Sequence, residues 1–218
     1  MFEAAIFDWD GTLADTRKGI VTSFHTALKE VDCDVSTEYI ERRIGIGAAD
    51  TFRDILKSKK GVVDEALVKR LVQRKSEVQI ALAAEVQLFE GAEELLGLLK
   101  GKIKVGLASM NNQAVISHLL KLHNLGGCFD VVLTVERVAK SKPEPDIFLK
   151  TAEELGVEAA KCVVFEDSIF GVKAAKAAGM GCVAVATGVY SADELKKEMP
   201  DLVVKSLLEA KIASFILS

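Results

Sequence analysis

The chain has 218 residues, of which half are hydrophobic, 28% are charged and three are proline, and its net charge is −4. These proportions exclude a disordered linker or tail, and because the lysines are scattered among acidic residues, a nucleic-acid partner is not expected. No apolar run approaches the roughly 20 residues that span a bilayer, and the acidic N-terminus is unlike a signal peptide, so we expect a cytoplasmic protein with no membrane partner.

The first part of the chain contains one predicted strand followed by a long helical stretch. Residues 4–8 form a short apolar run that ends in DWDGT, which indicates a buried strand. From Asp15 the apolar residues recur at helical spacing, and no convincing strand occurs between residues 14 and 86. Further helices are predicted at residues 37–44, 49–58 and 64–83.

The rest of the chain alternates between helices and strands that are apolar throughout. The predicted helices are 92–100, 112–123, 146–155 and 169–178, the predicted strands are 103–108, 130–134, 162–165 and 182–186, and a last strand and helix lie near 202–216. This order predicts an α/β fold with a Rossmann-like core, in which helices cover both faces of a parallel sheet. Residues 15–86 interrupt the order, so we expect an inserted all-helical domain on a core of residues 1–14 and 87–218.

In such a sheet, ligands bind beyond the carboxyl ends of the strands. Polar residues follow or lie near four of the predicted strands, namely Asp8, Asp10, Gly11, Thr12, Ser109, Asn111, Lys142, Glu166 and Asp167. Asp8 and Asp10 point to the same side of a strand end and repel each other unless a cation lies beside them. Mg²⁺ held by Asp8, a backbone carbonyl and Asp167 suits these oxygen ligands. With the Lys142 ammonium and the Ser109 hydroxyl, the site would accept a phosphoryl group.

Each of these residues alone has an ordinary structural explanation. Paired aspartates are common in turns and at helix caps, Ser109 could cap a helix, and Lys142 could be solvated. The adjacent Glu166 and Asp167 could cap the helix that follows them. Their order and placement, with each group at a strand end and supplying a different part of one site, favour the phosphate and metal interpretation.

The stretches IFDWDGTLADT, LASMNN, SKPEPDIF and VVFEDSIFGVKAAKAAGM resemble the four successive motifs of the haloacid dehalogenase superfamily. The resemblance covers essentially the whole chain. It implies that Asp8 is a nucleophile that forms an aspartyl-phosphate, and that Asp10 protonates the leaving oxygen and later activates water. Ser109 and Lys142 would hold the phosphoryl group. The implied Mg²⁺ ligands are Asp8, the Asp10 carbonyl, Asp167 and, directly or as an outer ligand, Glu166.

The same resemblance gives the inserted helices a role. Residues of about 15 to 85 look like the helical cap of the superfamily's first subclass, a lid that closes over the site and reads the leaving group. Its hinge strands would pass near residues 13–15 and 86–91, where Glu90 replaces the proline that usually precedes the hinge glycine. The candidate substrate contacts are Thr12 and Asn111 in the core and Arg17, Arg42, Arg43, Gly45 and Gly47 in the cap. A solvated helix face that ends at glycine explains the RRIGIG stretch equally well.

We therefore expect a Mg²⁺-dependent phosphatase of a small phosphorylated metabolite, either phosphoglycolate, to whose phosphatases the RxIGxG-like turn is similar, or a sugar phosphate. The main alternative is phosphoryl transfer as in β-phosphoglucomutase. Such mutases carry a histidine in the first cap helix, where this chain has Gly19 and Ile20. A dehalogenase, which needs no metal, is disfavoured by the three facing carboxylates of Asp8, Asp10 and Asp167. A non-catalytic phospho-receiver module would be much shorter and would lack a lid.

Overall fold

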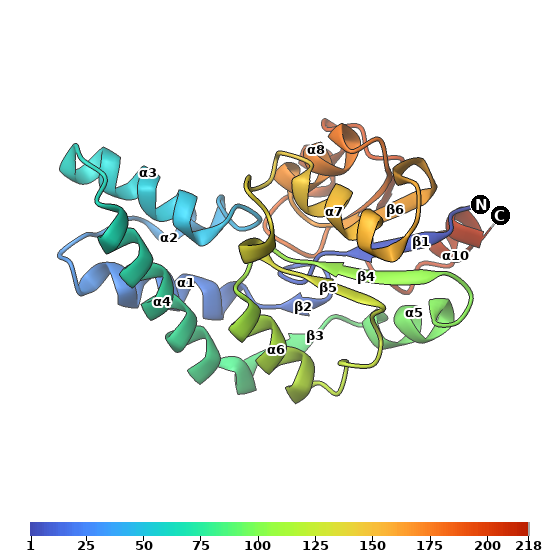
Figure 1. The fold of residues 1–218 in the computed structure, drawn as a ribbon, viewed down its shortest axis with the longest axis horizontal. Coiled ribbons are helices and arrows are strands. Elements are labelled where there is room, and N and C mark those ends of the chain that lie inside the picture. Colours follow the sequence, from blue (N-terminus) through green and yellow to red (C-terminus); the bar gives the residue numbers. More distant parts are fainter. Residues whose placement is uncertain (218) are drawn as a thin grey trace.

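A six-stranded sheet, with every neighbouring pair parallel, forms the centre of the larger part of the protein (Figure 1). The computed structural model describes residues 1–217, so Ser218, the last residue of the expected core domain, lies outside the described part. The strand order is β5-β4-β1-β6-β7-β8. The strands are β1 (Ala4–Phe7), β4 (Lys104–Ala108), β5 (Val131–Leu133), β6 (Cys162–Glu166), β7 (Gly181–Val185) and β8 (Leu202–Val204).

Strand β1 lies between β4 and β6, and the register places Phe7 beside Leu107 and Phe165. The carboxyl ends of these three strands therefore meet at one edge of the sheet. Because β4 lies on one side of β1 and β6 on the other, the chain order reverses there, which opens a crevice beyond the strand ends.

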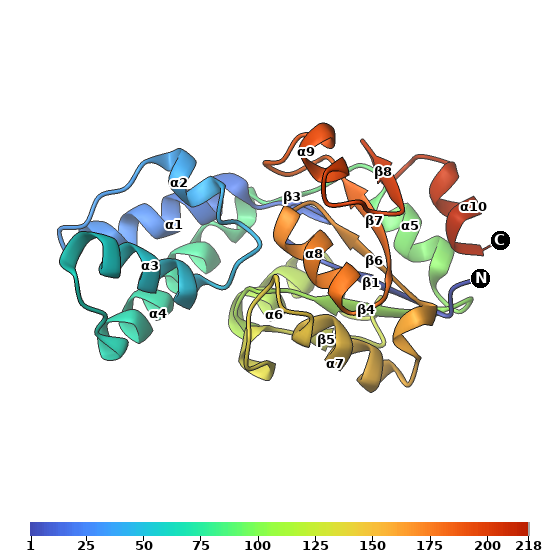
Figure 2. The ribbon, with the colours of Figure 1, turned by 90° about the horizontal axis from the view of Figure 1, so that it is seen from above.

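Helices cover both faces of the sheet, as Figures 1 and 2 show. The side chains of Ala5 and Phe7 belong to one buried hydrophobic cluster, and those of Ala4 and Ile6 belong to another, because successive residues of a strand point to opposite faces. The first cluster includes residues of α5 (Ala92–Leu99), α6 (Gln113–Leu122) and α10 (Lys211–Leu217), and the second those of α7 (Asp146–Leu155), α8 (Ile169–Ala177) and α9 (Ala192–Lys196). The predicted α/β fold class is confirmed.

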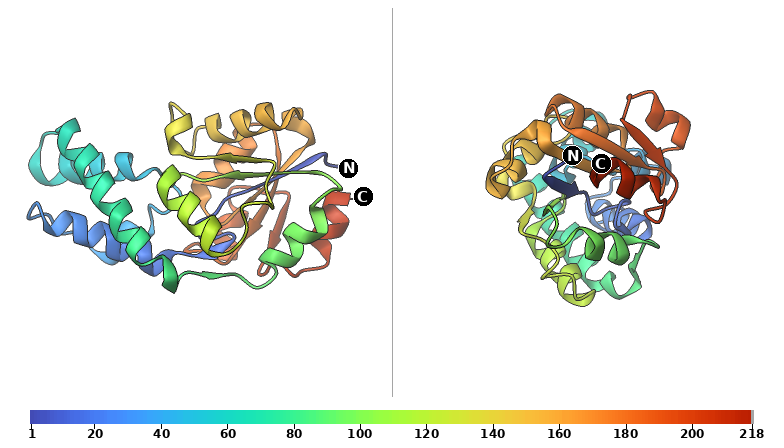
Figure 3. Two further views of the ribbon diagram at one scale, coloured as in Figure 1. Left: turned by 60° about the horizontal axis from the view of Figure 1, so that its bottom comes forward. Right: turned by 90° about the vertical axis from the view of Figure 1, so that its right-hand side faces the viewer.

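Four further helices form a block beyond the carboxyl ends of the strands, at the end of the molecule away from the termini (Figures 1 and 3). They are α1 (Arg17–Lys29), α2 (Thr37–Glu41), α3 (Ala48–Lys60) and α4 (Glu65–Ala81). These helices have a hydrophobic cluster of their own, in which the rings of Phe24 and Phe52 lie 4.7 Å apart. We call residues 17–81 the helical block.

Two short strands join the helical block to the core. β2 (Ala14–Asp15) pairs antiparallel with β3 (Gln87–Leu88), and the 3₁₀ turn Ala83–Glu85 precedes β3. Both strands fall where the superfamily resemblance implies hinge strands, although apolar patterning alone indicates none there, because a two-residue strand is too short to show alternation. Two other 3₁₀ turns occur in the core, at Val135–Arg137 and Ala159–Lys161.

Helix α9 was not predicted. It has five residues, and its start is stabilised by a capping box in which Ser191 and Glu194 bond reciprocally to each other's backbone. A helix of little more than one turn has no apolar period that can be recognised in a sequence. Among the described residues, no helix is long and apolar enough to cross a membrane.

Because the helical block has a hydrophobic cluster of its own, a substitution in that cluster should destabilise the block more than the core. Phe52 is fully buried there, so Phe52→Ala should lower the free energy of unfolding of the helical block by about 3–5 kcal/mol. Val62, which is 71% exposed between α3 and α4, provides the control, since Val62→Ala should change it by less than about 0.5 kcal/mol. Relative to the unaltered protein, Phe52→Ala should accelerate amide hydrogen exchange more in α1 and α3 than in β1 and β6. Uniform acceleration across the chain would contradict a separate cluster.

Candidate active site

The loop after β1 brings the first polar groups to the edge of the sheet. The Asp8 N–H donates to the Phe165 carbonyl at 3.0 Å, so Asp8 continues the line of the strand. Gly11 has a φ of +88°, and a Cβ at this position would lie 2.2 Å from Oδ2 of Asp167. Only glycine combines this backbone conformation with the close approach. The turn then directs the Thr12 hydroxyl to Oδ1 of Asp167 at 3.2 Å.

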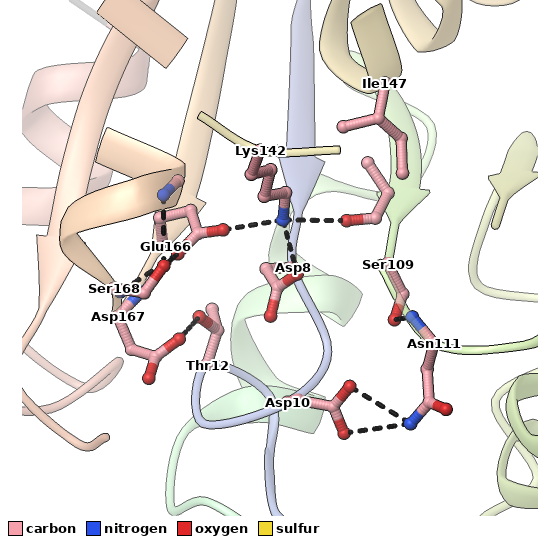
Figure 4. Close-up of polar contacts among 12 residues, drawn as sticks. Asp8, Asp10, Thr12, Ser109, Asn111, Lys142, Ile147, Glu166, Asp167 and Ser168 are labelled. Atoms are coloured by element: carbon pink, nitrogen blue, oxygen red, sulfur yellow. Dashed lines mark hydrogen bonds and ion pairs between the residues drawn. The ribbon is translucent and has the colours of Figure 1, made fainter. Parts of the chain in front are cut away.

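Lys142 links the three central strands (Figure 4). Its Nζ donates to Oδ1 of Asp8 at 2.7 Å, to Oε1 of Glu166 at 2.6 Å and to the Ala108 carbonyl at 3.4 Å. The residue is 1% exposed. Burial alone lowers the pKa of Lys142, but the charges of Asp8 and Glu166 outweigh burial and raise this pKa overall, so the ammonium stays charged. Three hydrogen bonds fix its position beside Asp8.

Glu166 has a different environment from that of a simple metal ligand. Its Oε2 accepts hydrogen bonds from the N–H groups of Asp167 and Ser168, both at 3.0 Å, and from the Ser168 hydroxyl at 2.9 Å. Its Oε1 is held by Lys142. A Cβ at Gly171 would lie 1.8 Å from the Glu166 carboxyl carbon, so a glycine leaves room for this carboxylate. Glu166 therefore orients Lys142 and the start of α8, which fits an outer role rather than direct contact with a metal.

Ser109, Asn111 and Asp10 form a second hydrogen-bonded group. Oγ of Ser109 accepts from the Asn111 N–H at 3.1 Å, which leaves the hydroxyl proton available to a ligand. Nδ2 of Asn111 donates to Oδ2 of Asp10 at 3.2 Å. Asn111 therefore orients the Asp10 carboxyl group, as Figure 4 shows, rather than only facing a substrate.

Negative charge exceeds positive charge in this buried region. Its buried carboxyl and ammonium groups are those of Asp8, Asp10, Glu166, Asp167, Lys75 and Lys142. Burial raises the pKa of Asp8 and of Asp167 well above the usual range, and the other carboxylates raise both values further. When all six groups are ionised, four carboxylates against two ammonium groups leave an excess of two negative charges, and these hard oxygen donors suit one Mg²⁺.

No group of three His, Cys, Asp or Glu side chains in the described residues is arranged to hold a metal by itself. The carboxylates of Asp10 and Glu166 are occupied by Asn111 and Lys142, respectively. Asp8, Asp167 and backbone carbonyls such as that of Asp10 are the donors that would hold the ion. Phosphoryl oxygens and water would complete its coordination, as is usual for Mg²⁺.

The helical block covers these groups and leaves a cavity of about 30 Å³ beside Asp8 and Asp10. Lys75 of α4 is 4% exposed, and its Nζ donates to the Gln79 side chain and to Oδ1 of Asn111, the latter at 3.3 Å. Burial lowers its pKa to about 8. The lining residues are Asp8, Asp10, Ile20, Phe24, Arg43, Ile44, Gly45, Ile46, Ala48, Lys75, Met110 and Asn111.

Sequence reasoning missed Lys75. Helix α4 carries basic residues on several sides, and nothing in their spacing separates Lys75 from Lys69, which is exposed, or from Arg74, which is partly exposed. Only the packing of α4 against α6, where Ser76 donates to Oδ1 of Asn112 at 2.9 Å, turns Lys75 inward.

The structure divides the predicted cap contacts into two groups. Arg43 lines the cavity, with its guanidinium 3.6 Å from the centre of the Tyr39 ring. Arg17 and Arg42 do not line it: Arg17 pairs with Glu41 at 2.8 Å, and Arg42 pairs with a core residue.

The two predicted cap glycines lie where the helical block meets the core. A Cβ at Gly45, whose φ is +103°, would lie 2.6 Å from the Ser168 hydroxyl, and one at Gly47 would lie 2.8 Å from the Ser141 hydroxyl. These two glycines therefore permit the close approach of the block to the strand ends.

Removal of the Lys142 ammonium should destabilise the core. Lys142→Met leaves Asp8 and Glu166 buried without their cation, so the free energy of unfolding at pH 7 should fall by about 3–5 kcal/mol. The loss should shrink toward pH 5, because burial raises the pKa of Asp8 well above its usual range and protonation of Asp8 removes part of the uncompensated charge. Denaturant unfolding at both pH values measures this, with Lys121→Met on the exposed side of α6 as the matched control. An equal loss in the two variants would contradict the central role of Lys142.

Comparison with known proteins adds an independent finding. A family model described as haloacid dehalogenase-like hydrolase matches residues 5–185. The chain is 34% identical over 212 residues to the probable phosphatase IndB of Dickeya dadantii, with 94% of this chain and 90% of that protein covered. It is 31% identical over 215 residues to the β-phosphoglucomutase of Bacillus subtilis, with 95% and 94% covered. A crystal structure of a hydrolase from Pseudomonas syringae superposes with a TM-score of 0.87 at 26% identity, over 99% of both chains.

Proposed function

The chain belongs to the haloacid dehalogenase-like hydrolase family, and from this we propose that it is a cytoplasmic, Mg²⁺-dependent phosphatase of a small phosphorylated metabolite. The observation that carries the proposal is the buried group at the strand ends, where Lys142 holds Asp8 at 2.7 Å and Asp167 lies beside the Asp8–Gly11 loop. A nucleophile, a fixed cation and a carboxylate suited to a divalent ion are the parts that phosphoryl transfer requires.

In the proposed reaction, Lys142 holds Oδ1 of Asp8, and Oδ2 attacks the phosphorus. The bond to the leaving oxygen breaks as Asp10, oriented by Asn111, gives that oxygen a proton. Asp10 then takes a proton from a water molecule, which attacks the phosphorus of the aspartyl-phosphate and frees Asp8. The Ser109 hydroxyl and the Lys142 ammonium would bind phosphoryl oxygens throughout. When bound, Mg²⁺ held by Asp8, the Asp10 carbonyl and Asp167 would offset the negative charge of the phosphoryl group.

The composition of the cavity favours hydrolysis over mutase action. Ile20, one of the two residues that stand where a mutase would be expected to carry its histidine, is 5% exposed and lines the cavity together with Phe24. An apolar side chain there can neither take nor give a proton. Water remains the acceptor for the phosphoryl group, even though a β-phosphoglucomutase is among the relatives.

The size and charge of the cavity favour a short, anionic leaving group. The cavity of about 30 Å³ leaves little free space while the helical block is in this position, which favours a small leaving group over a large one. Lys75 and Arg43 add positive charge to its wall on the side of the helical block. A carboxylate such as that of phosphoglycolate would suit both features better than an uncharged sugar would.

A panel of phosphate esters of increasing length tests the proposal. With Mg²⁺, the protein should release inorganic phosphate, fastest from phosphoglycolate, and Asp8→Asn should lower turnover by at least about a thousandfold. The Asp8→Asn protein, prepared in parallel, also controls for a contaminating phosphatase. Isomerised sugar phosphate without free phosphate would favour a mutase instead, and activity that survives a chelator would overturn the metal requirement.

Lys75 should give the reaction an alkaline limit. Because its pKa is lowered to about 8, it is an ammonium below that pH and a neutral amine above it. The kcat/KM for an anionic ester should therefore fall as the pH rises through about 8. Lys75→Met should lower kcat/KM at pH 7 by about tenfold or more and should abolish the alkaline limb, which is the fall of kcat/KM above about pH 8. Lys69→Met, on the exposed side of the same helix, should leave the profile unchanged, and a limb that persists in Lys75→Met would exclude Lys75 as its origin.

A further inference from the structure

Four residues between β7 and α9 contact the active site at one end and the helical block at the other. The Thr187 hydroxyl donates to the Gly11 carbonyl at 2.6 Å, in the loop that carries Asp8 and Asp10. Gly188 lies so close to Asp167 that a Cβ there would come within 1.7 Å of its Oδ2. We call residues 187–190 the coupling loop. Its first half therefore abuts both the nucleophile loop and a proposed metal ligand.

The second half of the coupling loop contacts the helical block. Val189 packs against the hydrophobic cluster of the block. The hydroxyl of Tyr190, a residue that is 5% exposed, donates to the Arg42 carbonyl at 2.6 Å. The Arg42 guanidinium lies 5.1 Å from the centre of the Tyr190 ring. The end of α2 is thus bound to the loop through both its backbone and its side chain.

Helix α9 strengthens this attachment. Nη1 of Arg42 donates to Oε1 of Glu194 at 2.7 Å. Oε2 of Glu194 accepts from the Ser191 N–H at 2.9 Å, which holds the carboxylate in place before Arg42 reaches it. A preoriented acceptor loses less side-chain entropy when the ion pair forms than a mobile one would.

We propose that the coupling loop ties closure of the helical block to the positions of Gly11 and Asp167, with Tyr190, Arg42 and Thr187 as positioning residues. Linkage makes the effect reciprocal. If closure of the helical block favours the observed position of Gly188, and that position favours the observed position of Asp167, then an ion bound at Asp167 favours closure to the same extent. The metal part of this inference rests on the proposed function, whereas the attachment of the block to the loop does not.

The test measures closure without turnover, using Lys75 as the reporter because its amine is buried against Asn111 of the core. Acetylation by an N-hydroxysuccinimide ester at pH 7.5 is followed by peptide mass spectrometry, with exposed Lys69 as the internal reference. In Tyr190→Phe, which loses only the hydroxyl, and in Arg42→Met, Lys75 should react about five- to tenfold faster than in the unaltered protein. Arg74→Met, which breaks a 2.6 Å pair with Glu30 inside the block, should not change the rate.

Mg²⁺ tests the other half of the proposal. Addition of Mg²⁺ should slow acetylation of Lys75 in the unaltered protein, and Thr187→Val should weaken this effect without raising the reactivity of Lys69. Equal rates of Lys75 acetylation in the unaltered protein, Tyr190→Phe and Arg42→Met would contradict the attachment of the helical block to the coupling loop. A Mg²⁺ effect that is missing in a Mg²⁺-dependent enzyme, or unchanged in Thr187→Val, would overturn the linkage. A protein that hydrolyses no ester would overturn the proposed function instead, and the acetylation rates would still decide the attachment.

Discussion

One buried ammonium group joins the parts of this protein on which its proposed chemistry depends. Lys142 binds an oxygen from each of the three central strands: the Ala108 carbonyl at the end of β4, Asp8 after β1 and Glu166 at the end of β6. Without this cation the carboxylates would repel one another in a region that excludes water. The same contacts orient Asp8, the proposed nucleophile. In this site the requirements of stability and of reactivity are met by one interaction.

The second constraint is the distance between the helical block and the strand ends. Gly45 and Gly47 let the block approach two core hydroxyl groups, and Lys75 then reaches the Asn111 side chain that also orients Asp10. Lys75, which would help to select the leaving group, is therefore connected to Asp10, the proposed general acid, through the side-chain amide of Asn111. The coupling loop connects the block to the proposed metal site on the opposite side of Asp10. Under the proposed coupling, both routes would make the geometry of the site depend on closure.

The similarity to both a probable phosphatase and a β-phosphoglucomutase means that the shared fold does not choose between the two reactions. The choice rests on a few side chains that line the cavity. Ile20 offers no proton to a phosphoryl-transfer intermediate, and Lys75 and Arg43 attract negative charge. These features belong to the helical block, whereas the residues proposed to handle the phosphoryl group belong to the core.

The sequence alone determined the α/β fold and the family, both of which are confirmed, and it also predicted a helical insertion at residues 15–86. Periodic apolar residues and contiguous motifs record these features, because each arises from neighbours along the chain. Most site residues could be named for the same reason, since they lie at or directly after the end of a strand, and Lys142, further beyond β5, belongs to the contiguous motif SKPEPDIF. Only the tertiary structure showed the contacts of Lys142 with Glu166, of Arg42 with Glu194 and of Lys75 with Asn111. These contacts join residues from distant segments, and the packing of the helical block against the core decides which of several similar charged side chains turns inward.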